Sequence, residues 1–280
     1  MLLVNFIFQL LNNFLYFCKK LIDKKVLMID SCAIMQPTYL PWLGYFDLMD
    51  QVDFFVFLDS VQMTRRSWQV RNRILTHNGE LFLTIPVKDG SRSETYLNNA
   101  LIADDVKWRG KHLQTIEMSY KKRPYFHEVF EFIYPLINEG STILGDLNIV
   151  IIESIAKRIG ITTELKKSSD LNDLQGQKEE RLIEICKQIG CRTYVSPQGS
   201  SAYIESEREG GLFLENGINL FYMNYEHPVY EQYSRKDFVP FMGIIDLLFN
   251  VGFDGSLEVI RSGHKSPLTY KEFREHYLNN

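Results

Sequence analysis

The apolar positions of this chain form two kinds of segment, short continuous runs and longer stretches in which apolar residues recur every three or four positions. Short runs bounded by polar residues or glycine are typical of buried strands, and the helical spacing is typical of amphipathic helices. The predicted strands cover residues 32–36, 54–58, 161–166, 192–195 and 218–222. The predicted helices cover residues 41–49, 106–118, 126–138, 144–158, 179–188 and 242–250.

The predicted strands and helices alternate along the chain, which indicates strand-helix-strand units. Such connections are normally parallel and right-handed, and ligands of such sheets bind beyond the carboxyl ends of the strands. The runs at 69–76 and 80–87 differ, because they flank His77-Asn78-Gly79, and Asn-Gly between apolar runs is a strong hairpin signal. We therefore predict an α/β fold, a mostly parallel, doubly wound sheet that gains an antiparallel hairpin and helical insertions.

Length and composition set the domain organisation. With 280 residues and 45% apolar content, the chain can bury a full core. We find no internal repeat and no low-complexity linker, so we predict a single α/β domain over residues 29–280. Residues 1–28 are predicted to form an apolar helical extension, with an upstream start choice as the alternative, because Met28 and Met35 could each open a compact core.

The first 18 residues are almost all apolar and are followed by two lysines. They lack the basic leading end and cleavage site of a signal peptide, and they are short and interrupted for a spanning helix. The polar residues share one helical stripe: Asn5, Gln9, Asn12 and Tyr16. This stripe predicts an amphipathic helix lying on a membrane or on a partner, against the alternative of an extension outside the domain.

Charge and cysteine usage narrow the classes of partner and compartment. The net charge is -4, so a nucleic-acid partner would need a local basic patch, and we expect none. The four cysteines fit neither a disulfide framework nor a Cys-x-x-Cys metal pair, and the scattered histidines show no metal-ligand spacing. We therefore expect a cytoplasmic protein without a metal, with contact to the inner face of the membrane through residues 1–18 as a further hypothesis.

Polar and aromatic residues are densest between Cys32 and Ile74. Each polar side-chain group there must be solvated or hydrogen-bonded, so we interpret this stretch as the floor and rim of a ligand site. Gln36 ends the first strand, where its amide can recognise a base or a sugar. Asp59 ends the second strand, where its carboxylate either acts on a substrate as general base or closes an Asx turn.

Two aromatic residues follow Gln36 in this stretch. Tyr39 either stacks on a nucleobase or pyranose or packs in the core, and these two interpretations stay open. Trp42 lies beside Leu40 and Leu43, and we predict that it packs in the core.

A polar cluster follows Asp59 and consists of Gln62, Arg71, Asn72 and Arg73. Arginines suit a diphosphate better than lysines do, because their guanidinium groups make planar, bidentate contacts. In an extended strand Arg71 and Arg73 point to one face and Asn72 to the other, so only one side of this triplet is expected to face the site. A solvated edge strand is the alternative.

Three candidates come from the second half of the chain. Ser196 and Tyr203 bound a loop of small residues that suits close approach of the backbone to a ligand. His227 follows the last predicted strand and is the histidine that we predict to act as acid or base, beside Asp59 as the other catalytic candidate.

Several blocks of the chain occur in a distinctive order. They are Gln36-Pro37-Thr38-Tyr39-Leu40-Pro41-Trp42-Leu43-Gly44-Tyr45-Phe46, Asp59-Ser60-Val61-Gln62, Arg71-Asn72-Arg73, Tyr194-Val195-Ser196 and Asp246-Leu247-Leu248-Phe249-Asn250. Together they resemble the signature of the WbqC-like protein family, from about Cys32 to past Gly252. The match departs at Met242-Gly243, where the family pattern has Leu-Ser.

The resemblance implies an enzyme of bacterial O-antigen and related surface-polysaccharide biosynthesis, which transfers glycine or another acyl group to the amine of a nucleotide-linked amino sugar. The alternatives are a non-catalytic nucleotide-sugar-binding or assembly protein of the same pathway and an ATP-dependent adenylate-forming ligase. The ligase hypothesis rests on a similar layout in nucleotidyltransferases and pantothenate-synthetase-like ligases, which hold ATP at the corresponding turn. Those enzymes use histidines there, whereas this turn offers Thr38, Tyr39 and Trp42. We predict that Thr38 binds the substrate.

Overall fold

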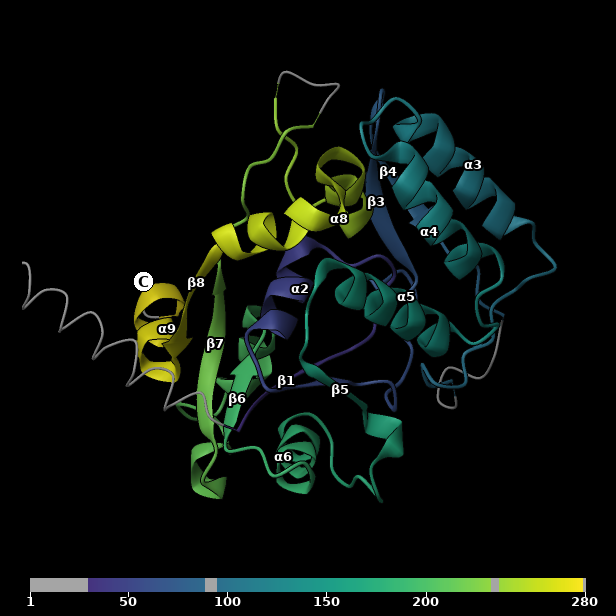
Figure 1. Ribbon diagram of the computed structural model, residues 1–280. Coiled ribbons are helices and arrows are strands. Elements are labelled where there is room, and N and C mark those ends of the chain that lie inside the picture. Colours follow the sequence, from purple (N-terminus) through teal and green to yellow (C-terminus); the bar gives the residue numbers. More distant parts are fainter. Residues whose placement is uncertain (1–29, 89–94, 233–236, 279–280) are drawn as a thin grey trace, which may run out of the picture.

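The structure is a computed structural model that describes residues 30–88, 95–232 and 237–278 (Figure 1). The predicted extension at residues 1–28, with its hypothetical membrane contact, lies outside these ranges. No helix within them is long and apolar enough to cross a bilayer.

A six-stranded sheet forms the centre of the molecule, in the order β5-β2-β1-β6-β7-β8. The strands are β1 (Ser31–Met35), β2 (Phe54–Phe57), β5 (Glu164–Lys167), β6 (Thr193–Ser196), β7 (Asn219–Tyr225) and β8 (His264–Thr269). The first five in this order run parallel, and β8 pairs antiparallel with β7. The prediction of a mostly parallel α/β sheet is confirmed.

Helices cover both faces of the sheet (Figure 1). One apolar core joins the sheet to α2 (Leu43–Asp50), α3 (Trp108–Tyr120), α4 (Phe126–Asn138), α5 (Leu144–Ile159) and α8 (Ile244–Ser262). A second core, on the other face, joins it to α6 (Glu179–Gln188), α7 (Ser201–Ile204) and α9 (Tyr270–Tyr277). The faces of alternate residues explain this division, since Ala33 packs in the first core and Cys32 and Ile34 in the second.

Three features differ from the prediction. Strands β3 (Arg71–Thr76) and β4 (Gly79–Thr84) do form the predicted antiparallel hairpin, but they make a separate two-stranded sheet and do not join the main one. Helix α8 extends past residue 250 and contains a kink at Gly252, where φ is 82°. Glycine accepts this left-handed conformation without strain, and the chain is helical again after it. Strand β8 and helix α9 were not predicted, since β8 begins with polar residues and has no apolar run.

The strand order places a topological switch point between β1 and β6. From β1 the chain continues to β2 and β5 on one side and later returns to β6 and β7 on the other. Crossover connections on opposite sides leave a crevice at the carboxyl ends of the two central strands, where ligands of such sheets bind. The loops after β1, β6 and β7 meet at this edge.

Candidate functional site

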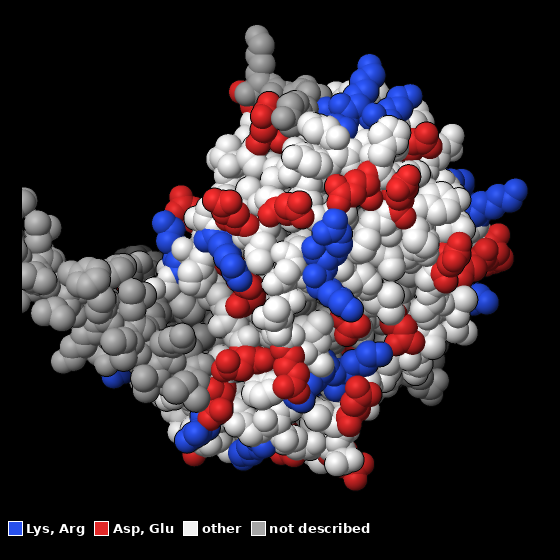
Figure 2. Space-filling model, viewed as in Figure 1, with Lys and Arg blue, Asp and Glu red and all other residues white. Residues whose placement is uncertain are grey.

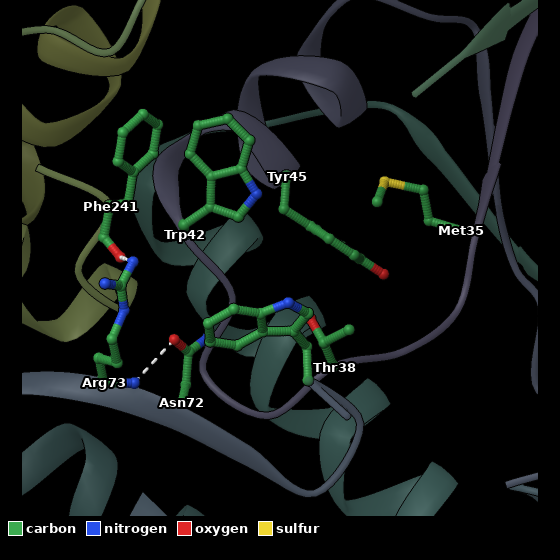
Figure 3. Close-up of a pocket in the computed structure, with 8 residues that line it drawn as sticks. Met35, Thr38, Trp42, Tyr45, Asn72, Arg73 and Phe241 are labelled. Carbon is green, nitrogen blue, oxygen red and sulfur yellow. Dashed lines mark hydrogen bonds between the residues drawn. The ribbon is translucent and has the colours of Figure 1, made fainter. Parts of the chain in front are cut away.

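A groove lies at the switch point and consists of two adjoining hollows of about 290 Å³ and 190 Å³. The hollows share Met35, Trp42 and Tyr45, which come from the end of β1 and the start of α2. The larger hollow is also lined by Thr38, Trp68, Asn72, Arg73 and Phe241 (Figure 3). The smaller one is also lined by Gly44, Pro197, Gln198, Gly199, Met223 and Tyr225.

The Trp42 indole is shared by both hollows and is partly buried against the first core, so Trp42 does pack on the core as predicted and also lines the groove. Its ring centroid lies 5.6 Å from that of Tyr225 and 5.5 Å from that of Phe241. Gly44 makes this position available, because a Cβ on Gly44 would lie 2.3 Å from Cη2 of the indole. The sequence Trp-Leu-Gly thus folds the indole back over the first turn of α2.

Phe241 forms the rim of the larger hollow and adopts a left-handed backbone conformation, with φ at 62°. Two contacts hold this backbone. Its N–H donates to Nε2 of His227 at 3.1 Å, and its carbonyl accepts from the Arg73 guanidinium at 3.0 Å (Figure 3). A non-glycine residue at such a φ persists only where surrounding contacts fix it, and such residues cluster at ligand sites.

The two bonds of His227 determine its tautomer. Nδ1 lies 2.9 Å from the Pro228 carbonyl, which can only accept, and Nε2 accepts from the Phe241 N–H. The imidazole is therefore neutral with its proton on Nδ1. Burial lowers the pKa of His227 and favours this form. Nε2 supports Phe241 at the rim and Nδ1 is bonded to the Pro228 carbonyl, so both ring nitrogens are used within the protein and the predicted acid or base role of His227 gains no support from this geometry.

Trp68 and Arg73 line one side of the larger hollow, and Phe82 and Arg71 stack behind them. We call these four residues the hairpin wall. The register of β3 and β4 pairs Arg73 with Phe82, and it places Arg71 and Arg73 on one face of the hairpin as predicted. The Arg71 guanidinium lies 4.7 Å from the Phe82 ring centre, and the Trp68 and Phe82 rings lie 6.0 Å apart. Arg73 also pairs with Glu80 at 2.7 Å. These stacked groups are partly exposed, as Trp68 at 49% shows.

Asn72 points to the opposite side of β3 and is buried. Its amide donates to the carbonyls of Tyr39 and Leu40 at 3.0 and 2.8 Å, and its oxygen accepts from the Arg73 N–H. Leu40 has φ at 45°, so Asn72 clamps the turn that carries Trp42. Asn72 borders the larger hollow, but its three hydrogen bonds are made within the protein.

Asp59 lies at the corner between the ends of β2 and β5 and is 1% exposed. Its carboxylate accepts from the Ser168 hydroxyl at 2.9 Å, the Ser169 N–H at 2.9 Å and the Ser169 hydroxyl at 2.6 Å. These bonds join two neighbouring strands across the corner. Asp59 does not line the groove, and the general-base role stays a prediction without geometric support.

The remaining sequence candidates spread over the groove and the core. Tyr39 is fully buried, and its hydroxyl lies 3.1 Å from Nδ1 of His112, which decides between the two interpretations in favour of the core. Gln36 is exposed at the end of β1 and accepts from the Gln69 amide at 2.7 Å. Thr38 lines the larger hollow, whereas Gln62 is exposed beyond it and pairs with Tyr96 in an isolated bridge.

Ser196 and Tyr203 border the second core. Ser196 is fully buried, and its hydroxyl donates to the Pro197 carbonyl at 3.2 Å. Tyr203 packs against the second core and does not line either hollow. The segment between them is not the predicted loop, because it forms a 3-10 helix at Gln198–Ser200 and then helix α7, which carries Tyr203. Its first residues, Pro197, Gln198 and Gly199, nevertheless line the smaller hollow.

Sequence reasoning included Trp68 only within the stretch of residues 32–74 predicted as the ligand site, did not name Phe241, and assigned Trp42 to the core alone. A signal for Trp68 exists, because this tryptophan lies in a polar segment between Arg66 and Arg71. No comparable signal marks Phe241, whose position depends on contacts with His227 and Arg73 from distant segments.

The smaller hollow contains a buried hydroxyl, that of Tyr225, without a hydrogen-bond partner among the described residues. Burial raises the pKa of Tyr225, and the neighbouring Asp47 carboxylate raises it further, so the group stays protonated. The groove therefore offers aromatic faces, one guanidinium and a neutral hydroxyl donor. This combination suits a planar or ring-shaped ligand with anionic or carbonyl oxygens.

Comparison with known proteins agrees with the resemblance in the blocks described above. The model of the WbqC-like protein family matches residues 36–257. The chain is 35% identical, over 79% of its own length and 93% of the relative's, to an uncharacterized protein of Mycobacterium tuberculosis. No solved structure matches the chain with significance. Because the family model covers most of the chain, including the groove residues from Thr38 to Phe241, the protein belongs to the WbqC-like protein family.

Proposed function

We propose that the protein is an enzyme of bacterial surface-polysaccharide biosynthesis, such as that of O-antigen, and that it transfers glycine or another acyl group to the amine of a nucleotide-linked amino sugar. The groove at the switch point binds the nucleotide-linked sugar. The observation that carries this proposal is the combination, in one groove, of the exposed Trp68 ring, the Trp42 indole and the Arg73 guanidinium.

The chemistry of the ligand matches these groups. A nucleobase stacks on aromatic side chains, and each stacked base contributes about 1–3 kcal/mol. The diphosphate is an anion that a guanidinium recognises. Arg73 uses one N–H of each terminal nitrogen for Glu80 and the Phe241 carbonyl, and its Nε–H has no partner among the described residues, so it keeps donors for the diphosphate. In the smaller hollow, the Tyr225 hydroxyl is a donor for the oxygen that becomes negative when an amine attacks an acyl group.

A non-catalytic nucleotide-sugar-binding protein of the same pathway is the second candidate, and one observation favours it. The two predicted catalytic side chains, Asp59 and His227, use their polar atoms within the protein. An enzyme would then rely on an activated acyl donor and on the incoming amine releasing its proton to solvent or to the substrate.

The groove does not fit the adenylate-forming ligase hypothesis. ATP phosphates at such a site lie at the amino end of the helix after the first strand. Here the Trp42 indole covers that end, within 2.3 Å of the Cβ position of Gly44. The described turn also supplies no histidine beside Thr38. We therefore do not propose ATP as a cofactor.

The test combines binding with product analysis. Thermal unfolding of the full chain is followed with a UDP-linked amino sugar, its N-acetylated counterpart, UDP and ATP. A ligand that binds only the native state stabilises it by about 2.7 kcal/mol at 100 times its dissociation constant. We expect stabilisation by the nucleotide-linked sugars and little by ATP.

Mass spectrometry then separates the two candidate functions. With an activated glycyl donor, the enzyme produces a nucleotide sugar that is heavier by one glycyl group, and the N-acetylated sugar stays unchanged. Binding without any such product supports the non-catalytic protein. Failure of every nucleotide-linked sugar to stabilise the protein would contradict both.

A further inference from the structure

Three cysteine side chains lie together in the core on the α6 face of the sheet. Cys32 belongs to β1, Cys186 to the last part of α6, and Cys191 precedes β6. The Sγ atom of Cys32 lies 3.5 Å from that of Cys186 and 2.8 Å from that of Cys191. All three sulfurs lie within 4.8 Å of one another and are buried. Cys191 also donates to the Thr193 carbonyl at 3.0 Å.

Packing alone accounts for a single buried cysteine, which behaves as a small apolar side chain. It does not account for three thiols that converge from three elements, because a thiol is a weak donor and gains little from facing another. Soft metal ions, in contrast, are bound by sulfur ligands gathered in this way.

We propose that Cys32, Cys186 and Cys191 bind one thiophilic metal ion as a three-thiolate site, with Cu(I) as its representative. Metal–sulfur bonds of about 2.3 Å place three sulfurs around one ion about 4 Å apart, so the group needs only small side-chain rotations. Structural zinc sites have four ligands, whereas the described residues bring no histidine or carboxylate into this group. A soft ion of low coordination number therefore fits better than zinc. On binding, the ion replaces the thiol protons, which pass to solvent.

The position of the cluster indicates what the ion does. Cys32 lies near the amino end of β1, whereas Met35, at the carboxyl end, borders the groove. The cluster is thus at the opposite end of the strand from the proposed substrate. An ion there ties α6 to β1 and β6, which stabilises the fold without taking part in the groove chemistry.

The spacing of the cysteines concealed this site, and the sequence led us to expect no metal. Cys186 and Cys191 are separated by the turn at Gly190, where φ is 73°. Cys32 joins them only because β1 pairs in parallel with β6, with Ser31 opposite Thr193. Only the strand pairing shows that the three lie together.

The experiment uses the full chain, reduced and free of metal, and titrates it anaerobically with Cu(I) against a competing chelator. We expect one Cu(I) per chain, ultraviolet thiolate-to-copper absorption and a raised melting temperature. Cys186→Ser should weaken Cu(I) binding by more than about 100-fold, since removing a ligand costs more than removing an outer-shell partner. Cys18→Ser is the control, because Cys18 is the remaining cysteine of the chain and is not one of the three proposed ligands, and this variant should bind as the parent does.

A second measurement does not depend on the variants folding. Copper-loaded and metal-free parent protein are alkylated over time without denaturant, where transient opening exposes buried thiols, and the alkylation of each cysteine is quantified by mass spectrometry. The proposal requires that copper protects Cys32, Cys186 and Cys191 together. Protection of none of them, or equal Cu(I) binding by the parent and Cys186→Ser, would overturn it. Stoichiometric zinc in place of copper would overturn the assignment of a low-coordinate ion.

Discussion

The groove and the corner around Asp59 lie at the same edge of the sheet, and the same stretch of sequence supplies residues to both. At the corner the Asp59 carboxylate accepts three hydrogen bonds from Ser168 and Ser169 and is buried. In the groove, Trp68 has an exposed face, and the Tyr225 hydroxyl has no partner among the described residues. A polar side chain at a strand end is thus a ligand group only where the protein leaves some of its bonding capacity unused.

Asp59→Ala should have the largest effect on stability. The substitution removes the acceptor of the buried Ser168 hydroxyl and of the N–H and hydroxyl of the exposed Ser169, and a buried donor without a partner costs about 1–3 kcal/mol. We expect a loss of about 3 kcal/mol in the free energy of unfolding, measured by urea denaturation. Affinity for the nucleotide sugar should stay unchanged at temperatures where the variant is folded.

The matched control is Asp170→Ala, which removes an exposed carboxylate from the same 3-10 turn. Its effect on stability should lie within about 0.5 kcal/mol. A stable Asp59→Ala variant that binds but makes no product would return Asp59 to the catalytic role and break the comparison.

A second test concerns His112. Its Nδ1 is hydrogen-bonded to the Tyr39 hydroxyl, so Tyr39, like Asp59, has its polar group paired within the protein. Burial lowers the pKa of His112 from 6.5 to about 4. The unfolded chain therefore binds a proton before the folded one does. This contribution to stability is complete above pH 6.5 and is lost as the pH falls from there toward 4. The full loss is about 3 kcal/mol, at 1.36 kcal/mol for each pKa unit.

Urea unfolding at several pH values checks this expectation. His112→Gln should flatten the fall in stability between pH 6.5 and 4, and His127→Gln, an exposed histidine on α4, should leave it as it is. Parallel slopes for His112→Gln and the parent protein would contradict the buried, neutral state of His112. The lowered pKa of His227 adds in the same direction, so some slope remains in His112→Gln.

Much of the fold could be predicted from the sequence, because its strands are short apolar runs and its helices have clear spacing. The runs at 54–58 and 192–195 became β2 and β6 within a residue or so of the expected bounds. The polar strand β8 could not be found in this way. It is set by pairing with β7, a long-range contact that a local pattern does not encode.

The position of the candidate site could be predicted from the sequence, but the residues that line it could be predicted only in part. The carboxyl edge of the sheet, Arg73 and Thr38 were expected, and they line the larger hollow. Which side chains satisfy one another could not be predicted, because the partners of Asp59 and Tyr39 are 109 and 73 residues away in sequence. Trp42 was assigned to the core because its apolar neighbours dominate the local pattern, and it does pack against the core. Its second role in the groove depends on Gly44, which leaves room for the indole.

Trp68→Ala tests the groove side of the comparison. Loss of one stacking face should weaken nucleotide-sugar binding by about 1–3 kcal/mol, measured by calorimetry. Since Trp68 is half exposed, stability should change by less than about 0.5 kcal/mol. Tyr134→Ala removes a ring of similar exposure from α4 and should affect neither quantity. Equal binding by the parent and Trp68→Ala would remove the hairpin wall from the site.

Arg71→Ala should have the smallest effect and distinguishes two roles for this arginine. Arg71 is not a lining residue of either hollow, and its guanidinium lies over Phe82, the ring that contacts Trp68. If it acts through this cation–π contact, Arg71→Ala weakens binding by about 0.5–1 kcal/mol, and the loss does not depend on salt. If it contacts the diphosphate directly, the loss is larger and shrinks as salt screens the charge. Arg192→Ala is the control, because it removes the same charge at the amino end of β6, and it should bind as the parent does. We expect the salt-independent result, since the geometry places Arg71 behind Phe82 and Trp68 rather than in the groove.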